Sequence, residues 1–188
     1  NVRNVSIGYM LKSLLGTVGS AQQAATGAYT HTFTLDGTVS QRPSLTLALA
    51  QGDLQHYEYD MAILNSLEIT TPIDDLVTAT ANFIAQGEAT HADYTPAVNS
   101  DDTYFRNHDV TFKVAANVAG LGAATPICLK ESSLTIASNT RPNWCVSNQA
   151  PNDILSLISE ITGSFTVDYE AETYHDLYAA GTYRALEI

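Results

Sequence analysis

Residues 44–86 carry the feature that most constrains the fold, an alternation of apolar and polar side chains with a period of two. Three alternating runs, at residues 45–49, 67–70 and 77–83, are separated by turn-forming residues such as Gly52 and Pro72. A period of two puts successive side chains on opposite faces of a strand, so one face is buried and the other faces solvent. The sequence therefore predicts consecutive amphipathic β-strands in this stretch.

A second set of similar runs follows in the other half of the chain. The similar pairs are residues 44–47 with 110–114, residues 65–69 with 132–136, and the run from Val77 with residues 165–169. The first two pairs share an offset of about 66 residues, and the third is shifted by an insertion. Two similar β units favour one sandwich or barrel built from both halves, because a lone hairpin cannot bury its apolar face. We expect one mainly-β domain over residues 1–188.

Two short helices are predicted to flank the strands. Residues 7–15 place apolar side chains at the i, i+3, i+4, i+7 spacing of a single helix stripe. Residues 173–180 repeat that stripe, and Thr173 with Asp176 resembles a capping box. A glycine follows each stripe and can end the helix.

The remaining segments are predicted from composition and length. We expect a strand at residues 29–35, a mobile linker or loop at 17–27, long irregular segments at 88–109 and 138–153, and either a short helix or a buried strand at 154–161. Long loops in a compact domain tend to be functional, and the two irregular segments are predicted to be contact arms that reach neighbouring subunits.

The acidic charge makes the chain a poor candidate for gripping nucleic acid. The chain has eight Lys plus Arg against twenty Asp plus Glu, a net charge of −12, and phosphate binding needs cations. No apolar run approaches the roughly 20 residues that span a bilayer, so no membrane partner is predicted. The two cysteines, Cys128 and Cys145, are expected to be reduced thiols in a protein assembled in the cytoplasm.

The ends of the sequence suggest a piece of a longer protein. The chain begins at Asn1 without Met and ends at Ile188 inside a strand-like run. We therefore expect additional residues before Asn1.

A search for catalytic and metal-binding patterns predicts no enzyme, no cofactor and no metal site. There is no GxSxG elbow. The five histidines, at positions 31, 56, 91, 108 and 175, are dispersed and never at metal-ligand spacing. Asp101, Asp102 and Asp109 could attract Ca²⁺ but lack EF-hand spacing, which favours a solvated acidic loop. The Gly120-Leu121-Gly122 triplet lacks the context of a phosphate loop and is predicted to be a turn.

Several longer strings resemble the phage major tail tube proteins. They are residues 7–16 (IGYMLKSLLG), 27–33 (GAYTHTF), 44–47 (SLTL), 63–69 (ILNSLEI) and 163–169 (GSFTVDY), followed by the short helix and the closing strand. The resemblance covers nearly all of the chain and rests on strand and turn residues rather than on an invariant site. Members of the family usually carry an additional N-terminal part, in agreement with the cut start.

The resemblance implies a tail tube β-sandwich with one or two flanking helices. Six copies would form a ring, and stacked rings would form a hollow tube that conducts double-stranded DNA from capsid to host. The implied partners are further copies of the chain and other tail proteins, namely the tape measure, the terminator and the baseplate or tip. The implied location is the tail of the virion, assembled in the host cytoplasm. The tube protein of type VI secretion shares the fold and is the related alternative, but residues 29–33 and 44–47 favour the phage version.

The solvent-facing side of the predicted strands supports a channel independently. Its residues are Ser66, Glu68, Thr70, Thr78, Thr80, Asn82, Ser133, Thr135, Thr166, Asp168 and Glu170. This set contains no Lys or Arg. Small polar groups and negative charge suit a lumen in which DNA must slide, because each cation would hold a phosphate. We predict that these eleven side chains face the lumen.

A second hypothesis from another class is a monomeric β-sandwich that binds a ligand such as carbohydrate. Such a module should gather the ten Tyr and Trp144 on one exposed concave face. A tube subunit should instead have extended loops and unpaired strand edges.

Overall fold

The computed structural model describes residues 2–3, 6–37, 41–52, 54–91, 103–168 and 172–188. The chain is mainly β with a few short helices, which confirms the predicted fold class. The elements in chain order are α1 (Ile7–Leu15), β1 (Gly16–Gln22), β2 (Tyr29–Leu35), β3 (Leu45–Gln51), β4 (Gln55–Thr71), β5 (Thr78–Ile84), β6 (Gly87–His91), η1 (Asn107–Asp109), β7 (Lys113–Ala115), η2 (Val118–Ala123), β8 (Leu129–Ala137), β9 (Arg141–Asn143), β10 (Asp153–Leu155), β11 (Glu160–Val167), α2 (Thr173–Ala179) and β12 (Ala185–Glu187).

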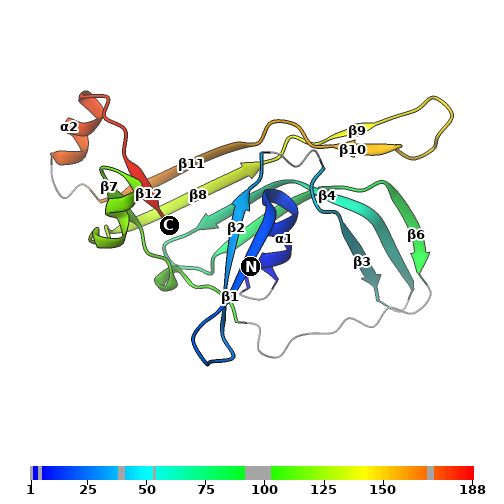
Figure 1. The fold of residues 1–188 in the computed structure, drawn as a ribbon, viewed down its shortest axis with the longest axis horizontal. Helices are drawn as coiled ribbons and strands as arrows, with labels where there is room; N and C mark the ends of the chain where they lie inside the picture. The colour runs from blue at the N-terminus through cyan, green and yellow to red at the C-terminus, as the bar shows by residue number, and fades with distance from the viewer. Residues whose placement is uncertain (1, 4–5, 38–40, 53, 92–102, 169–171) are drawn as a thin grey trace.

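The long strand β4 organises the fold because its two halves belong to different sheets. Its first half pairs with β3 and β6, and its second half pairs with β5 and β8, all antiparallel. The halves meet at Met61, whose φ of 47° lies in the left-handed region that few non-glycine residues adopt. We call β5, residues 63–71 of β4, β8 and β11 the central sheet, and β3, residues 55–60 of β4 and β6 the arm sheet (Figure 1).

Helix α1 covers one face of the central sheet. Leu14 of the helix forms the core with Leu64, Leu67 and Ile136 of the sheet. Met10, Leu11 and Leu15 of α1 pack against this cluster, as the predicted helix stripe requires. Gly16 ends the helix with a φ of 98°, a conformation that glycine adopts at little cost. This core cluster therefore lies between α1 and the apolar face of the central sheet.

Two-stranded hairpins project away from this core. The β1–β2 hairpin lies on the α1 side, the β9–β10 hairpin and the arm sheet extend from one end of the central sheet, and α2 with the β7–β12 pair lies at the other end (Figure 1). All residues of β1 and β2 are exposed or half-buried. The β1–β2 hairpin is therefore held by backbone pairing more than by burial.

Several local predictions differ from the structure. Most of the predicted linker at residues 17–27 is strand β1, which buries no apolar side chain and forms because its backbone pairs with β2. The segment at 138–153 contains β9 and the start of β10. Residues 154–161 are neither one helix nor one strand, since β10 ends at Leu155 and β11 begins at Glu160. The N-cap of helix α2 is Glu172 and not Thr173, so Thr173 does not hold the position that the proposed capping box requires.

The predicted repeat holds for two of its three pairs. Strand β8 pairs with β11 as β4 pairs with β5. Residues 110–114 do not reproduce β3, however, because β7 pairs with β12 and not with β8. Within the predicted arm at 88–109, β6 and η1 are described, and residues 92–102 lie outside the described part of the chain.

The molecule exposes more surface than a compact monomer of its size. Its accessible area is 12,491 Å², whereas a folded monomer of 20.2 kDa has about 8,800 Å². The difference falls in the range that obligate interfaces bury. The fold therefore leaves a large surface for partners.

Candidate channel face and assembly surfaces

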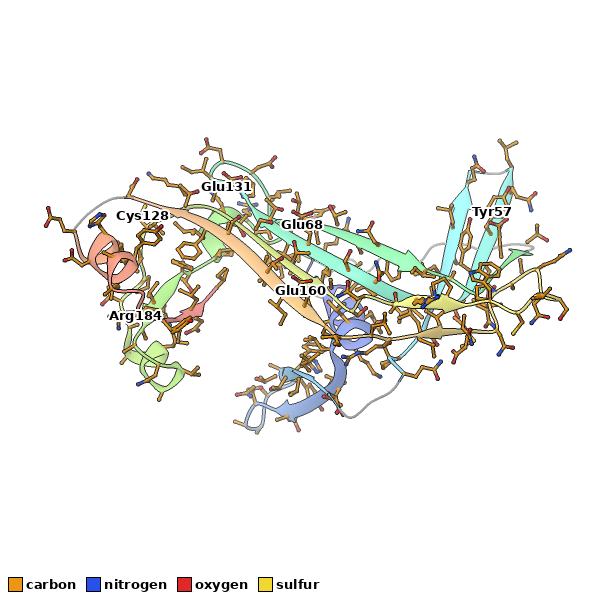
Figure 2. All side chains as sticks on the ribbon, turned by 90° about the horizontal axis from the view of Figure 1, so that it is seen from above. Tyr57, Glu68, Cys128, Glu131, Glu160 and Arg184 are labelled. Atoms are coloured by element: carbon orange, nitrogen blue, oxygen red, sulfur yellow. The ribbon has the colours of Figure 1, made fainter. Side chains whose placement is uncertain are left out.

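Strand pairing brings the predicted lumen residues of the central sheet onto one face. Glu68 lies opposite Thr80 of β5 and Thr135 of β8, and Thr135 lies opposite Thr162 of β11. Directly paired residues point to the same side of a sheet. The neighbouring rows are Ser66 with Asn82 and Ala137, and Thr70 with Thr78, Ser133 and, in β11, Ser164. Figure 2 shows Glu68 on the side of the sheet opposite α1.

We call this surface the polar face. Its residues are Ser66, Glu68, Thr70, Thr78, Thr80, Asn82, Glu131, Ser133, Thr135, Ala137, Glu160, Thr162, Ser164 and Thr166. Side chains bond across it: Ser133 Oγ donates to Glu68 Oε1 at 3.1 Å, and Asn82 Nδ2 donates to Ser66 Oγ at 2.9 Å. Its charged members are Glu68, Glu131 and Glu160 (Figure 2).

The eleven residues predicted from the sequence to face the lumen do not include all of the polar face. Glu131, Glu160, Thr162 and Ser164 belong to it by register. Extending the alternation backwards along β8 and β11 would have found them. Glu170, the last residue of the predicted set, lies outside the described residues.

Asp168 follows an irregularity in the strand register between Thr166 and Val167. Its Oδ2 accepts a hydrogen bond from Lys130 Nζ at 2.9 Å and from Cys128 Sγ at 3.6 Å. The hydrogen bond from Lys130 lowers the pKa of Asp168, and the same bond raises the pKa of Lys130. The carboxylate of Asp168 is therefore paired with a cation, unlike the three glutamates of the polar face.

Both lateral edges of the central sheet are open among the described residues. Strand β5 pairs with β4, strand β11 pairs with β8, and neither has a second described neighbour. Natural monomers protect such edges with Lys, Pro or bulges that interrupt pairing. The sequences TATANFI of β5 and EITGSFTV of β11 contain no Lys, Arg or Pro. Ile161 and Phe165 of β11 are exposed on its apolar side. Both strands can therefore add a further strand.

The projecting hairpins also expose apolar side chains. Leu54 at the β3–β4 turn is 88% exposed, and Trp144 and Val146 in the β9–β10 loop are exposed. Isolated exposed apolar residues are ordinary, but large ones grouped at a hairpin tip mark a contact surface.

The two cysteines are free and exposed. Cys128 precedes β8 near α2, whereas Cys145 lies in the β9–β10 loop at the opposite end of the molecule (Figures 1 and 2). This separation excludes a bridge between them within one subunit.

The exposed aromatic residues do not form one platform. They lie on α1 (Tyr9), β2 (Tyr29), the segment before η1 (Tyr104, Phe105), the β9–β10 loop (Trp144), β11 (Phe165), α2 (Tyr178) and the segment before β12 (Tyr183). A carbohydrate-binding face needs such rings side by side. The described aromatic residues therefore do not support the binding-module hypothesis.

Metal and membrane sites were sought in the described residues alone. These hold no group of three or more His, Cys, Asp or Glu side chains placed to bind a metal ion. Within the same ranges no helix has the length and apolar character needed to cross a membrane.

Comparison with known proteins identifies the class to which this fold and its open edges belong. A family model described as "Phage tail tube protein" matches residues 1–188. The chain belongs to the phage tail tube protein family and is a structural subunit of the tail tube, a component of the virion tail that assembles with other copies and other tail proteins. A search of curated protein sequences gave no match.

Proposed function

We propose that six copies of this chain form a ring whose central sheets join edge to edge, and that stacked rings conduct double-stranded DNA through a lumen lined by the polar face. The observation that carries this proposal is the four-stranded central sheet, with two unprotected edges, one apolar face under α1 and one polar face.

The edges support ring closure. Strand β5 of one subunit would pair with β11 of the next, a heterologous contact in which different surfaces meet. Repeating such a contact gives a ring when the rotation closes, and closure removes the free edges of the central sheets. Six sheets of four strands would give a barrel of 24 strands, whereas 16 to 18 strands already leave an aqueous channel in porins.

The size of that barrel suits a channel. With strands about 4.8 Å apart and tilted by about 40°, 24 strands give a barrel roughly 50 Å across between opposite backbones. The inner surface must then be the polar face, because α1 occupies the other side of each sheet.

Electrostatics also favours this orientation. Glu68, Glu131 and Glu160 would place three carboxylates per subunit, eighteen per six-membered ring, on the channel wall. In a narrow channel the fields of like charges add, so the wall repels phosphates. Repulsion keeps DNA from binding the wall and lets it slide.

Disulfide cross-linking across the proposed seam tests the ring. In a background of Cys128→Ser and Cys145→Ser, one cysteine is placed in β5 (Thr80→Cys or Asn82→Cys) and one in β11 (Thr162→Cys or Ser164→Cys). Mild oxidation should give at least one pair that yields a ladder of linked subunits ending at six on a non-reducing gel. A single cysteine in β5 or β11 alone is the control and should give no ladder. A complete absence of ladders from all four pairs, in protein that forms tubes by electron microscopy, would refute edge-to-edge pairing.

A further inference from the structure

Arg42 is the least expected buried residue of the molecule. It is 6% exposed and lies between β2 and β3. Its Nη1 donates to Leu15 O at 2.7 Å and to Asp36 O at 3.3 Å, and its Nη2 donates to Ser159 Oγ at 3.1 Å. These bonds tie the end of α1, the end of β2 and the start of β11 to one guanidinium. No carboxylate among the described residues forms an ion pair with it.

The guanidinium retains an unused donor beside a cavity. Arg42 Nε is buried and has no hydrogen-bond partner, and the same is true of Ser156 Oγ. Both residues line a cavity of about 840 Å³, together with Asp36, Gly37, Asn139, Leu157 and Ile158. Among the described residues, the buried guanidinium has no ion pair and the buried hydroxyl has no hydrogen-bond partner, and both situations are unfavourable. An anionic acceptor that reaches Arg42 Nε and Ser156 Oγ would relieve both.

The wall of the cavity adds an apolar requirement. Leu157 and Ile158 are exposed large apolar residues at its rim. The matching occupant is a carboxylate next to an apolar side chain, since Arg binds carboxylates through parallel N–H donors.

The turn between β4 and β5 has this chemistry. Ile73 is an exposed apolar residue, and Asp74, next to it, is an exposed carboxylate. No hydrogen bond or ion pair of the described chain involves the Asp74 carboxylate. The neighbouring Asp75 differs, because its Oδ1 accepts a hydrogen bond from the Leu76 N–H at 2.7 Å.

The turn and the cavity lie at opposite ends of the central sheet. The turn follows Thr71, the last residue of β4, and precedes β5. The cavity lies where β8 has ended at Ala137 and β11 has not yet begun at Glu160. A subunit therefore cannot fill its own cavity with its own turn, but rings stacked in one direction bring one end of a sheet against the other end of the next.

We propose that the cavity around Arg42 receives the Asp74 carboxylate of a subunit in the adjacent ring, with Ile73 packed on Leu157 and Ile158. This axial contact rests on the proposed ring function and is separate from the β5–β11 seam. It is heterologous and does not close, and such contacts generate filaments of unlimited length. The seam sets the size of a ring, and the Arg42 contact joins rings into a tube.

Replacing each aspartate by the nearly isosteric asparagine tests whether the Asp74 carboxylate itself makes the contact or whether the loss of any negative charge in the turn changes assembly. Asp74→Asn removes the charge from an exposed turn and leaves the fold intact, so rings should form while the protein concentration needed for long tubes rises at least ten-fold. Asp75→Asn, the matched control, removes the same charge one residue away and should assemble as wild type. Equal tube formation by wild type and both variants, or equal impairment of both variants, would overturn the proposal.

Arg42→Lys tests the other side of the contact without removing the positive charge. Lys lacks the Nε donor and the planar fork, so this variant should resemble Asp74→Asn, and combining the two should add little. Additive losses in the double variant would mean that the two residues act independently and would count against the proposal.

Cross-linking gives a direct readout. In the background free of Cys128 and Cys145, Ser156→Cys is nearly isosteric and is paired with Asp74→Cys. Oxidised tubes should yield linked products that continue beyond six subunits, unlike the ladder of the β5–β11 seam. Ser156→Cys paired with Asp176→Cys, from α2 at the same end as the turn, is the control and should give no such products. A seam ladder that ends at six together with no axial products would refute the Arg42 contact alone, whereas the absence of both would refute the ring proposal.

Discussion

The central sheet and the projecting hairpins differ in what holds them in place. Leu14, Leu64 and Leu67 are buried between α1 and the sheet, and burial of this kind is the main favourable term in folding. The strands of the β1–β2 hairpin bury no side chain, and Ile154 is the one buried strand residue of the β9–β10 hairpin, so both hairpins depend largely on backbone pairing. An isolated two-stranded hairpin is marginally stable in water.

This difference divides the molecule into a part that stabilises the subunit and parts whose stability depends on partners. The large accessible area agrees with such a division, because the hairpins expose both of their faces. Substitutions in the sheet should therefore change the folding of one subunit, and substitutions in the hairpins should change assembly.

The largest effect is expected for Leu67→Ala. Leu67 is 0% exposed in the core beneath α1, so truncation should lower the free energy of unfolding by about 2 to 5 kcal/mol. Leu54→Ala is the matched control at the β3–β4 turn, 88% exposed, and should change it by no more than about 0.5 kcal/mol. Urea denaturation of unassembled subunits measures both. Similar losses for the two variants would contradict the division between sheet and hairpins.

A second test asks whether the β9–β10 loop serves assembly. Trp144→Ser combined with Val146→Ser removes exposed apolar groups, so subunit stability should change by less than about 1 kcal/mol. Trp residues are frequent interface hot spots worth at least about 2 kcal/mol, equivalent to roughly a 30-fold rise in the concentration needed to form tubes. Sedimentation and electron microscopy measure that concentration. Tyr178→Ser, at an exposed position of α2 outside the hairpins, is the control and should assemble as wild type. Unchanged assembly by the loop variant would exclude the loop from the interfaces.

The same division explains which elements could be predicted from sequence. Helix α1 was predicted with its observed bounds, and β5 within one residue, because an apolar face against the core imposes a period. Strand β1 was missed because its GTVGSAQ sequence buries no side chain and so has no period to read. Strand β9 was missed because it also buries no side chain and because Pro142 within it argued against a strand. Strand β10, in which Ile154 is buried, lies largely in the stretch 154–161 that was predicted to be either a short helix or a buried strand.

The candidate sites also differ in how far they could be predicted from the sequence. The polar face was largely predictable, since alternation alone decides which side chains share a face. The Arg42 cavity was not, because it joins α1, β2 and the segment before β11 through contacts far apart in the sequence. The edges of β5 and β11 became apparent only from the order of strands in the sheet.

Reversing the charges on the polar face should change the passage of DNA without changing the stability of the central sheet or the assembly of the hairpins. Glu68→Lys, Glu131→Lys and Glu160→Lys should leave the subunit folded, within about 0.5 kcal/mol each, because the groups are solvent-facing. If the polar face lines the channel, DNA release from particles should slow at least several-fold at low salt and recover as salt rises, since phosphate contacts are salt-dependent. Glu172→Lys with Asp176→Lys, on α2, is the control for added charge. Release at the wild-type rate from intact triple-variant tubes would place these carboxylates away from the DNA path.

The smallest effect concerns the ion pair at the end of the central sheet nearest α2. Lys130 donates to Asp168 across 2.9 Å, and this bond lowers the pKa of Asp168. A carboxyl group whose pKa is lower in the folded state stabilises that state above its unfolded pKa, and the contribution is lost as the pH falls through the folded pKa. Both groups are solvent-exposed, so salt and water screen the pair and the change in unfolding free energy should be small. Carboxyl carbon NMR should find that Asp168 titrates at lower pH than an ordinary aspartate and that Lys130→Met raises its pKa. Lys113→Met, which removes the partner of Glu187 in the β7–β12 pair, is the control and should leave Asp168 unchanged. An Asp168 titration that is the same with and without Lys130 would show that the pair does not persist in solution, and Asp168 would then be an unpaired carboxylate like the glutamates of the polar face.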